Sequence, residues 1–148
     1  MKLLIASIHS ARTHSPEQER LASLYFERIP QYTPIEVKVF QSEEAFFSAN
    51  EKLKARTAPV LVLLDVRGEL FSSEQFAAWI GRQRDSGIQN LTLAIGPADG
   101  WSSAARSRAD RLLSFGPMTL AHELARVVLA EQVYRAFTIL AGHPYHRL

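Results

Sequence analysis

The last six residues bring three chemically different side chains together. Residues 143–148 read His-Pro-Tyr-His-Arg-Leu, so that a phenol, an imidazole and a guanidinium follow one another at Tyr145, His146 and Arg147. An aromatic ring beside cationic groups suits stacking on a nucleic-acid base and gripping of a phosphate. The competing interpretation is a polar tail that lies along the surface without a function, because chain ends are commonly solvated.

Glycines near the ends of apolar runs form a second group of candidates. They lie in residues 64–68, 95–100 and 114–119. In open α/β sheets, ligands bind beyond the carboxyl ends of the strands, and glycine lets the backbone approach a ligand closely. Each segment taken alone is more often an ordinary turn, because such dipeptides punctuate many loops.

Several other kinds of site are disfavoured by the residues. The chain has no cysteine, which excludes disulfides, thiolate zinc sites and cysteine nucleophiles. It carries neither a dinucleotide fingerprint nor a phosphate-binding loop nor a nucleophile elbow. His122, His143 and His146 lack metal-ligand spacing, since Pro-Tyr separates the last two, and no metal is expected.

The elements that must position these residues alternate between strands and helices. Such alternation predicts an α/β fold with a mostly parallel sheet covered by helices on both faces. Helix starts are indicated by Ser15-Pro16, by a capping box of Ser72 with Gln75, by Ser102 and by Thr119. The corresponding helices should end before Pro30, near Gly87, at Arg111 and at Gly142, while residues 41–56 are only weakly helical. Strands are expected at residues 2–8, 35–40, 60–65, 91–96 and 112–115.

Length and composition are those of one globular domain. The 148 residues are 47% hydrophobic and 22% charged, which argues against disorder and favours a single domain over residues 1–148. No apolar run approaches the roughly 18 residues that a bilayer requires. The net charge of +2 permits a nucleic-acid partner without demanding one.

Residues 112–148 resemble the C-terminal segment of a known family. The resemblance is carried by His122, by the run Glu-Gln-Val-Tyr-Arg-Ala at residues 131–136, and by the terminal Tyr-His-Arg. Leu-Asp-Val-Arg-Gly at residues 64–68 and Ile95-Gly96 also match in order and spacing. The chain is thereby similar to the SPOUT-class ribosomal large-subunit pseudouridine N3-methyltransferases of the RlmH type.

The resemblance implies a fold, a reaction and a set of site residues. It implies a C-terminal trefoil knot over approximately residues 60–148, a homodimer in the cytoplasm without membrane attachment, and S-adenosyl-L-methionine (SAM) as methyl donor without a metal. The substrate would be N3 of a pseudouridine in the helix 69 stem-loop of 23S rRNA within the assembled ribosome. His146 would assist proton removal, Tyr145 would orient the base, and Arg135 and Arg147 would hold phosphate or imide oxygen. The implied SAM contacts are Leu64, Gly96, Phe115, Gly116, Pro117, Met118, Thr119 and Leu120.

The chain also departs from the family pattern. Pro97 stands where a second glycine is usual and removes a backbone N–H, Ala121 stands where proline is usual, and Glu69 stands where lysine is usual. His9-Ser10 replaces a common Gly-Lys, and residues 41–56 are shorter and less basic than is usual.

Two alternatives to the enzyme remain. Pro97 motivates a ribosome-binding or assembly module on the same fold with weak or no catalysis. A flavodoxin-like small-molecule binding protein fits only the α/β pattern and explains neither the tail nor residues 131–136.

Overall fold

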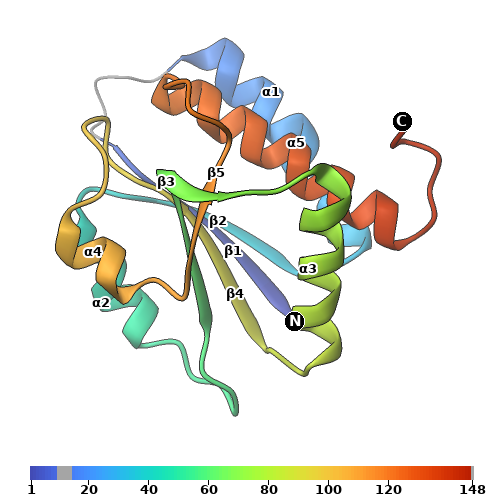
Figure 1. Ribbon diagram of the computed structural model, residues 1–148, viewed down its shortest axis with the longest axis horizontal. Coiled ribbons are helices and arrows are strands. Elements are labelled where there is room, and N and C mark those ends of the chain that lie inside the picture. The colour runs from blue at the N-terminus through green and yellow to red at the C-terminus, as the bar shows by residue number, and fades with distance from the viewer. Residues whose placement is uncertain (10–14, 148) are drawn as a thin grey trace.

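The computed structural model describes residues 1–9 and 15–147. Five parallel strands form one sheet in the order β2-β1-β4-β3-β5 (Figure 1). This arrangement confirms the predicted α/β class with a parallel sheet. The strands are β1 (Lys2–Ile8), β2 (Ile35–Phe40), β3 (Val60–Leu70), β4 (Asn90–Ile95) and β5 (Arg111–Ser114).

The helices cover both faces of this sheet. The elements α1, α3 and α5 lie on one face, and α2 and α4 lie on the other (Figure 1). Their bounds are α1 (Pro16–Phe26), the short 3-10 helix η2 (Ile29–Gln31), α2 (Glu43–Glu51), α3 (Ser73–Asp85), α4 (Ser103–Arg108) and α5 (His122–Leu140). No helix within the described residues is both long and apolar enough to cross a membrane.

Two apolar cores lie on either side of the central strands. Because side chains alternate along a strand, Leu3 and Ile5 of β1 face the core beneath α1, α3 and α5, whereas Ala6 and Ile8 face the smaller core beneath α2 and α4. The edge strand β2 is at best half-buried, and even its apolar residues Val37 and Val39 are 36% and 46% exposed.

Local signals placed most helix starts correctly. Ser15, Ser72 and Ser102 accept a backbone N–H at the starts of α1, α3 and α4, and Ser72 forms the predicted capping box with Gln75. The weakly helical residues contain a true helix, α2, which is capped by Ser42.

Three predicted boundaries are wrong. Thr119 does not cap α5, which begins at His122 after Ala121 and has no side-chain cap. The helix after Ser102 ends at Arg108 rather than Arg111. It ends there because Asp110 bonds to the strand β3: its carboxylate accepts the Leu61 N–H at 2.7 Å, and its own N–H donates to the Leu61 carbonyl at 2.9 Å.

The third wrong boundary is that of β3, which continues through the segment predicted to be a loop. Leu64 pairs with Leu113 in β5, and Glu69 pairs with the same Leu113 after an irregular stretch. The residues between them therefore pass closely around β5. A Cβ on Gly68 would lie 2.5 Å from the Leu112 carbonyl carbon, so that only glycine fits at this crossing.

Candidate functional site

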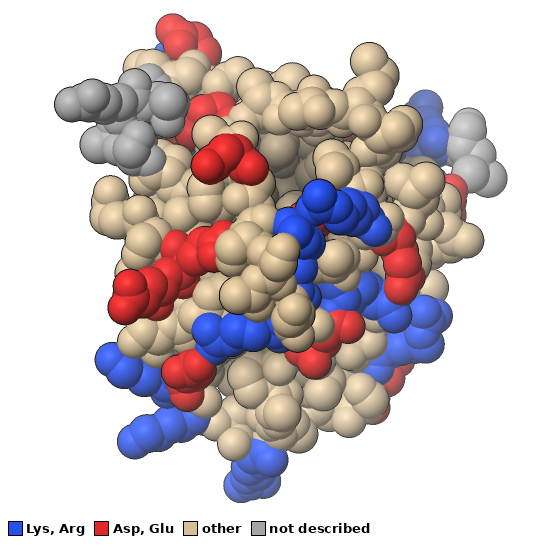
Figure 2. Space-filling view, turned by 60° about the vertical axis from the view of Figure 1, so that its left-hand side comes forward, with Lys and Arg blue, Asp and Glu red and all other residues tan. Residues whose placement is uncertain are grey.

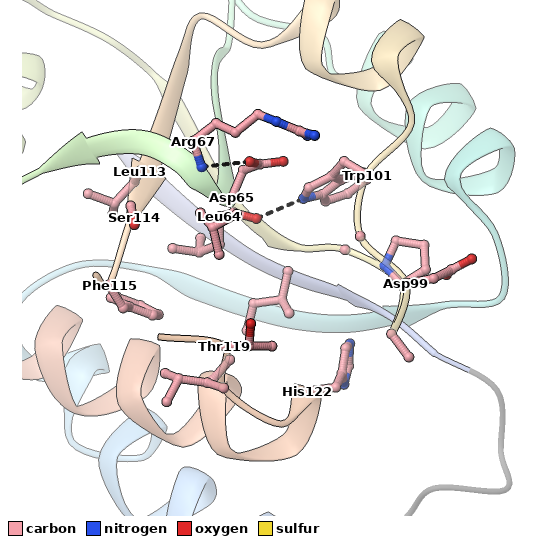
Figure 3. A pocket seen from close by; sticks show the side chains of 18 of the residues that line it. Leu64, Asp65, Arg67, Asp99, Trp101, Leu113, Ser114, Phe115, Thr119 and His122 are labelled. Atoms are coloured by element: carbon pink, nitrogen blue, oxygen red, sulfur yellow. Dashed lines mark hydrogen bonds between the residues drawn. The ribbon is translucent and has the colours of Figure 1, made fainter. Parts of the chain in front are cut away.

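A cavity of about 640 Å³ opens beyond the carboxyl ends of β3, β4 and β5. Its volume is in the range of small-molecule sites, and its position is the one at which α/β sheets bind ligands. Figure 3 shows Leu64, Trp101, Phe115, Thr119 and His122 around it. The three glycine-containing segments that the sequence singled out thus meet at one place.

Most of the predicted SAM contacts line this cavity. Seven of the eight do so, and Pro117 does not: the lining members are Leu64, Gly96, Phe115, Gly116, Met118, Thr119 and Leu120. Met118 is largely exposed, with 81% of its surface accessible.

Trp101 connects the first two segments and was not singled out by the sequence. Its ring lies against Gly96, where a Cβ would approach the ring atoms to 2.8 Å. Its indole N–H donates to the Leu64 carbonyl at 3.1 Å, which uses one acceptor site of that carbonyl. Gly96 is therefore required for packing as well as being available to a ligand. A lone tryptophan after Gly100 carries no motif, so only the fold could reveal its place.

The third segment is held by a local hydrogen-bonded turn. Ser114 Oγ accepts the Gly116 N–H at 3.0 Å and donates to the Gly116 carbonyl at 3.0 Å, and Gly116 has a positive φ of 123°. The N-terminus of α5 follows and reaches the cavity at His122 and Ala125. Since no side chain caps this helix, its first N–H groups are available to a polar or anionic ligand group.

Charged groups line one side of the cavity. The Asp65 carboxylate is buried and lies 3.8 Å from the Arg106 guanidinium, which also donates to the Trp101 carbonyl. Asp65 also accepts the Arg67 N–H at 2.9 Å. On the face shown in Figure 2, acidic and basic side chains are interspersed around a hollow. The site thus combines apolar walls with a few fixed charges.

Pro97 also lines the cavity. Its carbonyl accepts the Gly100 N–H at 2.8 Å in a turn in which Gly100 has a positive φ of 88°. The turn is formed without an N–H at residue 97, so proline removes a donor from the cavity wall without disturbing the fold.

The predicted catalytic residues meet at a different place. Glu131 on α5 accepts from the Tyr145 hydroxyl at 3.0 Å and from the Arg135 Nε at 3.0 Å. Arg135 Nη1 lies 3.0 Å from His146 Nδ1, and His146 Nε2 lies 2.8 Å from a Glu74 oxygen. Tyr145, His146 and Arg135 therefore form one network. Arg147 is not part of it and makes no hydrogen bond to the described residues. Glu131 falls inside the family-like run, whereas Glu74 is a partner that only the fold could reveal.

The contacts favour one tautomer of the His146 ring. A guanidinium can only donate, so Nδ1 must accept from Arg135 and carry no proton. The ring proton then lies on Nε2 and is donated to Glu74. Burial, followed by the Glu131 hydrogen bond, raises the pKa of the Tyr145 hydroxyl, which keeps it a neutral donor.

The tail network and the cavity are well separated within one chain. None of Arg135, Tyr145, His146 and Arg147 lines the cavity. The helix α5 has 19 residues and is about 28 Å long at about 1.5 Å per residue. Its first residue, His122, lies at the cavity, whereas Arg135 lies in its C-terminal half. The tail follows the C-terminal end of this helix (Figure 1).

Comparison with known proteins places the sequence in a family. Residues 1–146 match the family model described as a predicted SPOUT methyltransferase. The chain is 47% identical over 146 residues to the ribosomal RNA large subunit methyltransferase H of Koribacter versatilis (strain Ellin345), covering 99% of this chain and 98% of that protein. It is 51% identical over 104 residues to the protein of the same name from Brucella ovis, covering 70% of this chain and 62% of that protein.

Solved structures share the fold at low sequence identity. A probable methylase family protein from Haemophilus influenzae Rd KW20 superposes with a TM-score of 0.60 at 12% identity, covering 99% of this chain and 70% of the other. The SpoU methyltransferase AviRb from Streptomyces viridochromogenes gives a TM-score of 0.50 at 16% identity, covering 96% and 60%.

Proposed function

Because the chain belongs to the SPOUT methyltransferase family, we propose that it transfers a methyl group from SAM to N3 of a pseudouridine in helix 69 of 23S rRNA. The substrate would be the assembled ribosome in the cytoplasm. The observation that carries the proposal is the cavity at the strand ends, which gathers seven of the eight residues implied to contact SAM. The names of the Koribacter and Brucella relatives support rRNA as the substrate.

The cavity suits SAM chemically. Apolar walls from Leu64, Phe115 and Leu120 would surround the adenine, and the uncapped start of α5 offers N–H groups to a carboxylate. SAM supplies a methyl group made electrophilic by its sulfonium. The protein must therefore orient the base and remove the N3 proton, after which the nitrogen lone pair forms the new N–C bond as the S–C bond breaks.

The tail residues take the remaining roles. Tyr145 orients the base through its ring, since its single hydroxyl proton is donated to Glu131. Arg135 and Arg147 hold phosphate or imide oxygen. For His146 to accept the N3 proton at Nδ1, it must release the contact with Arg135 that occupies this nitrogen. The bound base would have to take the place of Arg135 at this nitrogen.

A homodimer would resolve the separation between tail and cavity, because the tail of one subunit could reach the cavity of the other. Leu21 and Leu24 support this arrangement. They are 43% and 44% exposed, share one face of α1 at a spacing of three residues, and leave an apolar surface uncovered in the monomer. The close passage of residues 65–68 around β5 similarly supports the trefoil knot implied by the family.

The test measures methyl transfer and SAM binding separately. We expect the purified protein to bind SAM by calorimetry and to methylate whole ribosomes lacking the modification, but not naked RNA. The His146→Ala, Arg147→Ala double variant should lose methyl transfer while it still binds SAM. Exposed Arg82→Ala on α3 serves as a charge-matched control and should retain transfer. Full transfer by the double variant would refute the tail roles.

Pro97 favours one alternative, a ribosome-binding module that has lost efficient catalysis. A folded protein that binds ribosomes yet gives no heat with SAM would support it. Mass spectrometry of rRNA from cells with and without the gene decides between the two. If one methylated pseudouridine is lost when the gene is absent, the protein is the enzyme and not the binding module.

A further inference from the structure

Three potential metal ligands converge beside the cavity. His9 directly follows β1, and His122 and Glu123 are the first residues of α5. One ligand atom from each lies within 4.8 Å of the other two. The two imidazole rings are 5.1 Å apart at their centroids, and His122 Nδ1 lies 3.7 Å from a Glu123 oxygen.

Four polar atoms of these side chains are buried without a hydrogen-bond partner in the described part of the chain. The side chains of His122 and Glu123 are only 10% and 9% exposed. Within residues 1–9 and 15–147, His9 Nδ1, both ring nitrogens of His122 and one Glu123 oxygen have no hydrogen-bond partner. Buried polar atoms are nearly always paired, so several unpaired atoms at one point indicate that something else satisfies them.

We propose that His9, His122 and Glu123 form a binding site for a divalent transition-metal ion of the zinc class. The metal would join the end of β1 to the start of α5 and would take no part in the methyl-transfer chemistry. The proposal departs from the expectation that the chain holds no metal, which weighed His122 with His143 and His146 but not with His9. His9 and His122 come from opposite ends of the chain, so sequence spacing could not pair them.

The ligand set decides which ion fits. Two imidazoles and a carboxylate suit Zn²⁺, whereas Mg²⁺ and Ca²⁺ prefer oxygen ligands. Ligands about 2.0–2.1 Å from a tetrahedral zinc lie roughly 3.4 Å apart, so the 3.7 Å separation of His122 and Glu123 needs little adjustment. Three protein ligands leave the fourth position for water.

Glu123 has a second role in this arrangement. The N-terminus of a helix carries partial positive charge, which opposes a cation. A cation can therefore bind here only because the carboxylate compensates for that charge. The decisive variants are His9→Ala, which removes a ligand, and Glu123→Gln, which keeps the shape and removes the charge.

The experiment adds Zn²⁺ to full-length protein stripped with a chelator. We expect one ion per chain by calorimetry and, at about 100-fold excess over Kd, a rise in Tm of roughly 5–10 °C. Co²⁺ in its place should give the visible absorption of a tetrahedral nitrogen and oxygen site. His9→Ala and Glu123→Gln should each weaken binding by more than the roughly 10- to 100-fold that loss of an outer-shell partner costs.

The control removes the two histidines of the C-terminal tail. A His143→Ala, His146→Ala variant should bind Zn²⁺ as the unmodified protein does. The proposal is overturned if the unmodified protein shows neither heat nor a Tm shift, or if binding persists in His9→Ala and is lost in the tail variant. Circular dichroism verifies that each variant is folded. SAM binding is measured by calorimetry with and without Zn²⁺, so that failure of zinc binding can be told apart from failure of the proposed methyl transfer.

Discussion

At the scale of residues, the tail depends on partners elsewhere in the fold. Glu131 lies at the centre of its network, because one of its oxygens binds both Tyr145 and Arg135. Glu74 on α3 completes it through His146. The Tyr145 ring also packs edge-on against the Tyr134 ring, with the two ring centroids 4.7 Å apart, and this contact anchors the tail to α5.

Removing Glu131 tests this network. In Glu131→Ala the Tyr145 hydroxyl and the Arg135 guanidinium lose their shared acceptor, and we expect the free energy of unfolding to fall by about 1.5–3 kcal/mol. Methyl transfer should fall as well, because the tail is no longer held. Urea unfolding measures the first effect. Glu44→Ala, at an exposed position of α2, provides the control; equal stability of the two variants would contradict the role of Glu131.

The raised pKa of Tyr145 makes a prediction about alkaline pH. Burial, then the Glu131 hydrogen bond, holds the folded-state pKa above the ordinary value of 10.0. The folded protein therefore retains a proton that the unfolded chain loses, so this contribution to stability is complete below pH 10.0 and declines above it.

Tyr145→Phe removes that titration and keeps the ring. We expect the stability of Tyr145→Phe to fall less steeply between neutral pH and pH values above 10.0 than that of the unmodified protein, as measured by urea midpoints. Identical pH profiles of the two proteins would show that the hydroxyl is not held by Glu131.

At the scale of elements, the irregular strand β3 shapes the site. It pairs with β5 on both sides of residues 65–68, and this turn brings Asp65 and Arg67 to the cavity. The apolar run at residues 60–64 predicted the strand, but no local sequence pattern indicates that pairing with β5 resumes at Glu69. Long-range pairing with β5 decides that boundary.

Gly68→Ala tests the crossing of these two strands. Its Cβ would meet the Leu112 and Leu113 backbone at 2.5–2.6 Å, and backbone cannot give way as a side chain can. We expect a loss of about 3 kcal/mol or more in the free energy of unfolding. Gly81→Ala on α3 is the matched control, because it meets only the flexible end of Leu140 and should be tolerated far better. Comparable Tm values for the two would contradict the close crossing.

At the scale of the whole molecule, catalysis by the proposed mechanism requires two chains. The cavity and the tail lie toward opposite ends of α5, so neither is complete alone. Replacing both Leu21 and Leu24 with glutamate should place charges on the proposed contact face and convert the proposed dimer to monomers in sedimentation experiments. Methyl transfer should then be lost while each subunit remains folded. Replacing exposed Arg82 with glutamate on α3 is the control, and a dimer that persists in the leucine variant would exclude this face.

The sequence by itself determined the α/β class, the order of the strands along the chain and most helix starts, because periodicity and capping are local. Its family-like residues also pointed to the three segments at the strand ends and to the tail. Only the tertiary structure placed Trp101 against Gly96, paired β5 with both parts of β3, separated the tail from the cavity and brought His9 to His122 and Glu123. These contacts join residues far apart in the chain, and no local pattern encodes them.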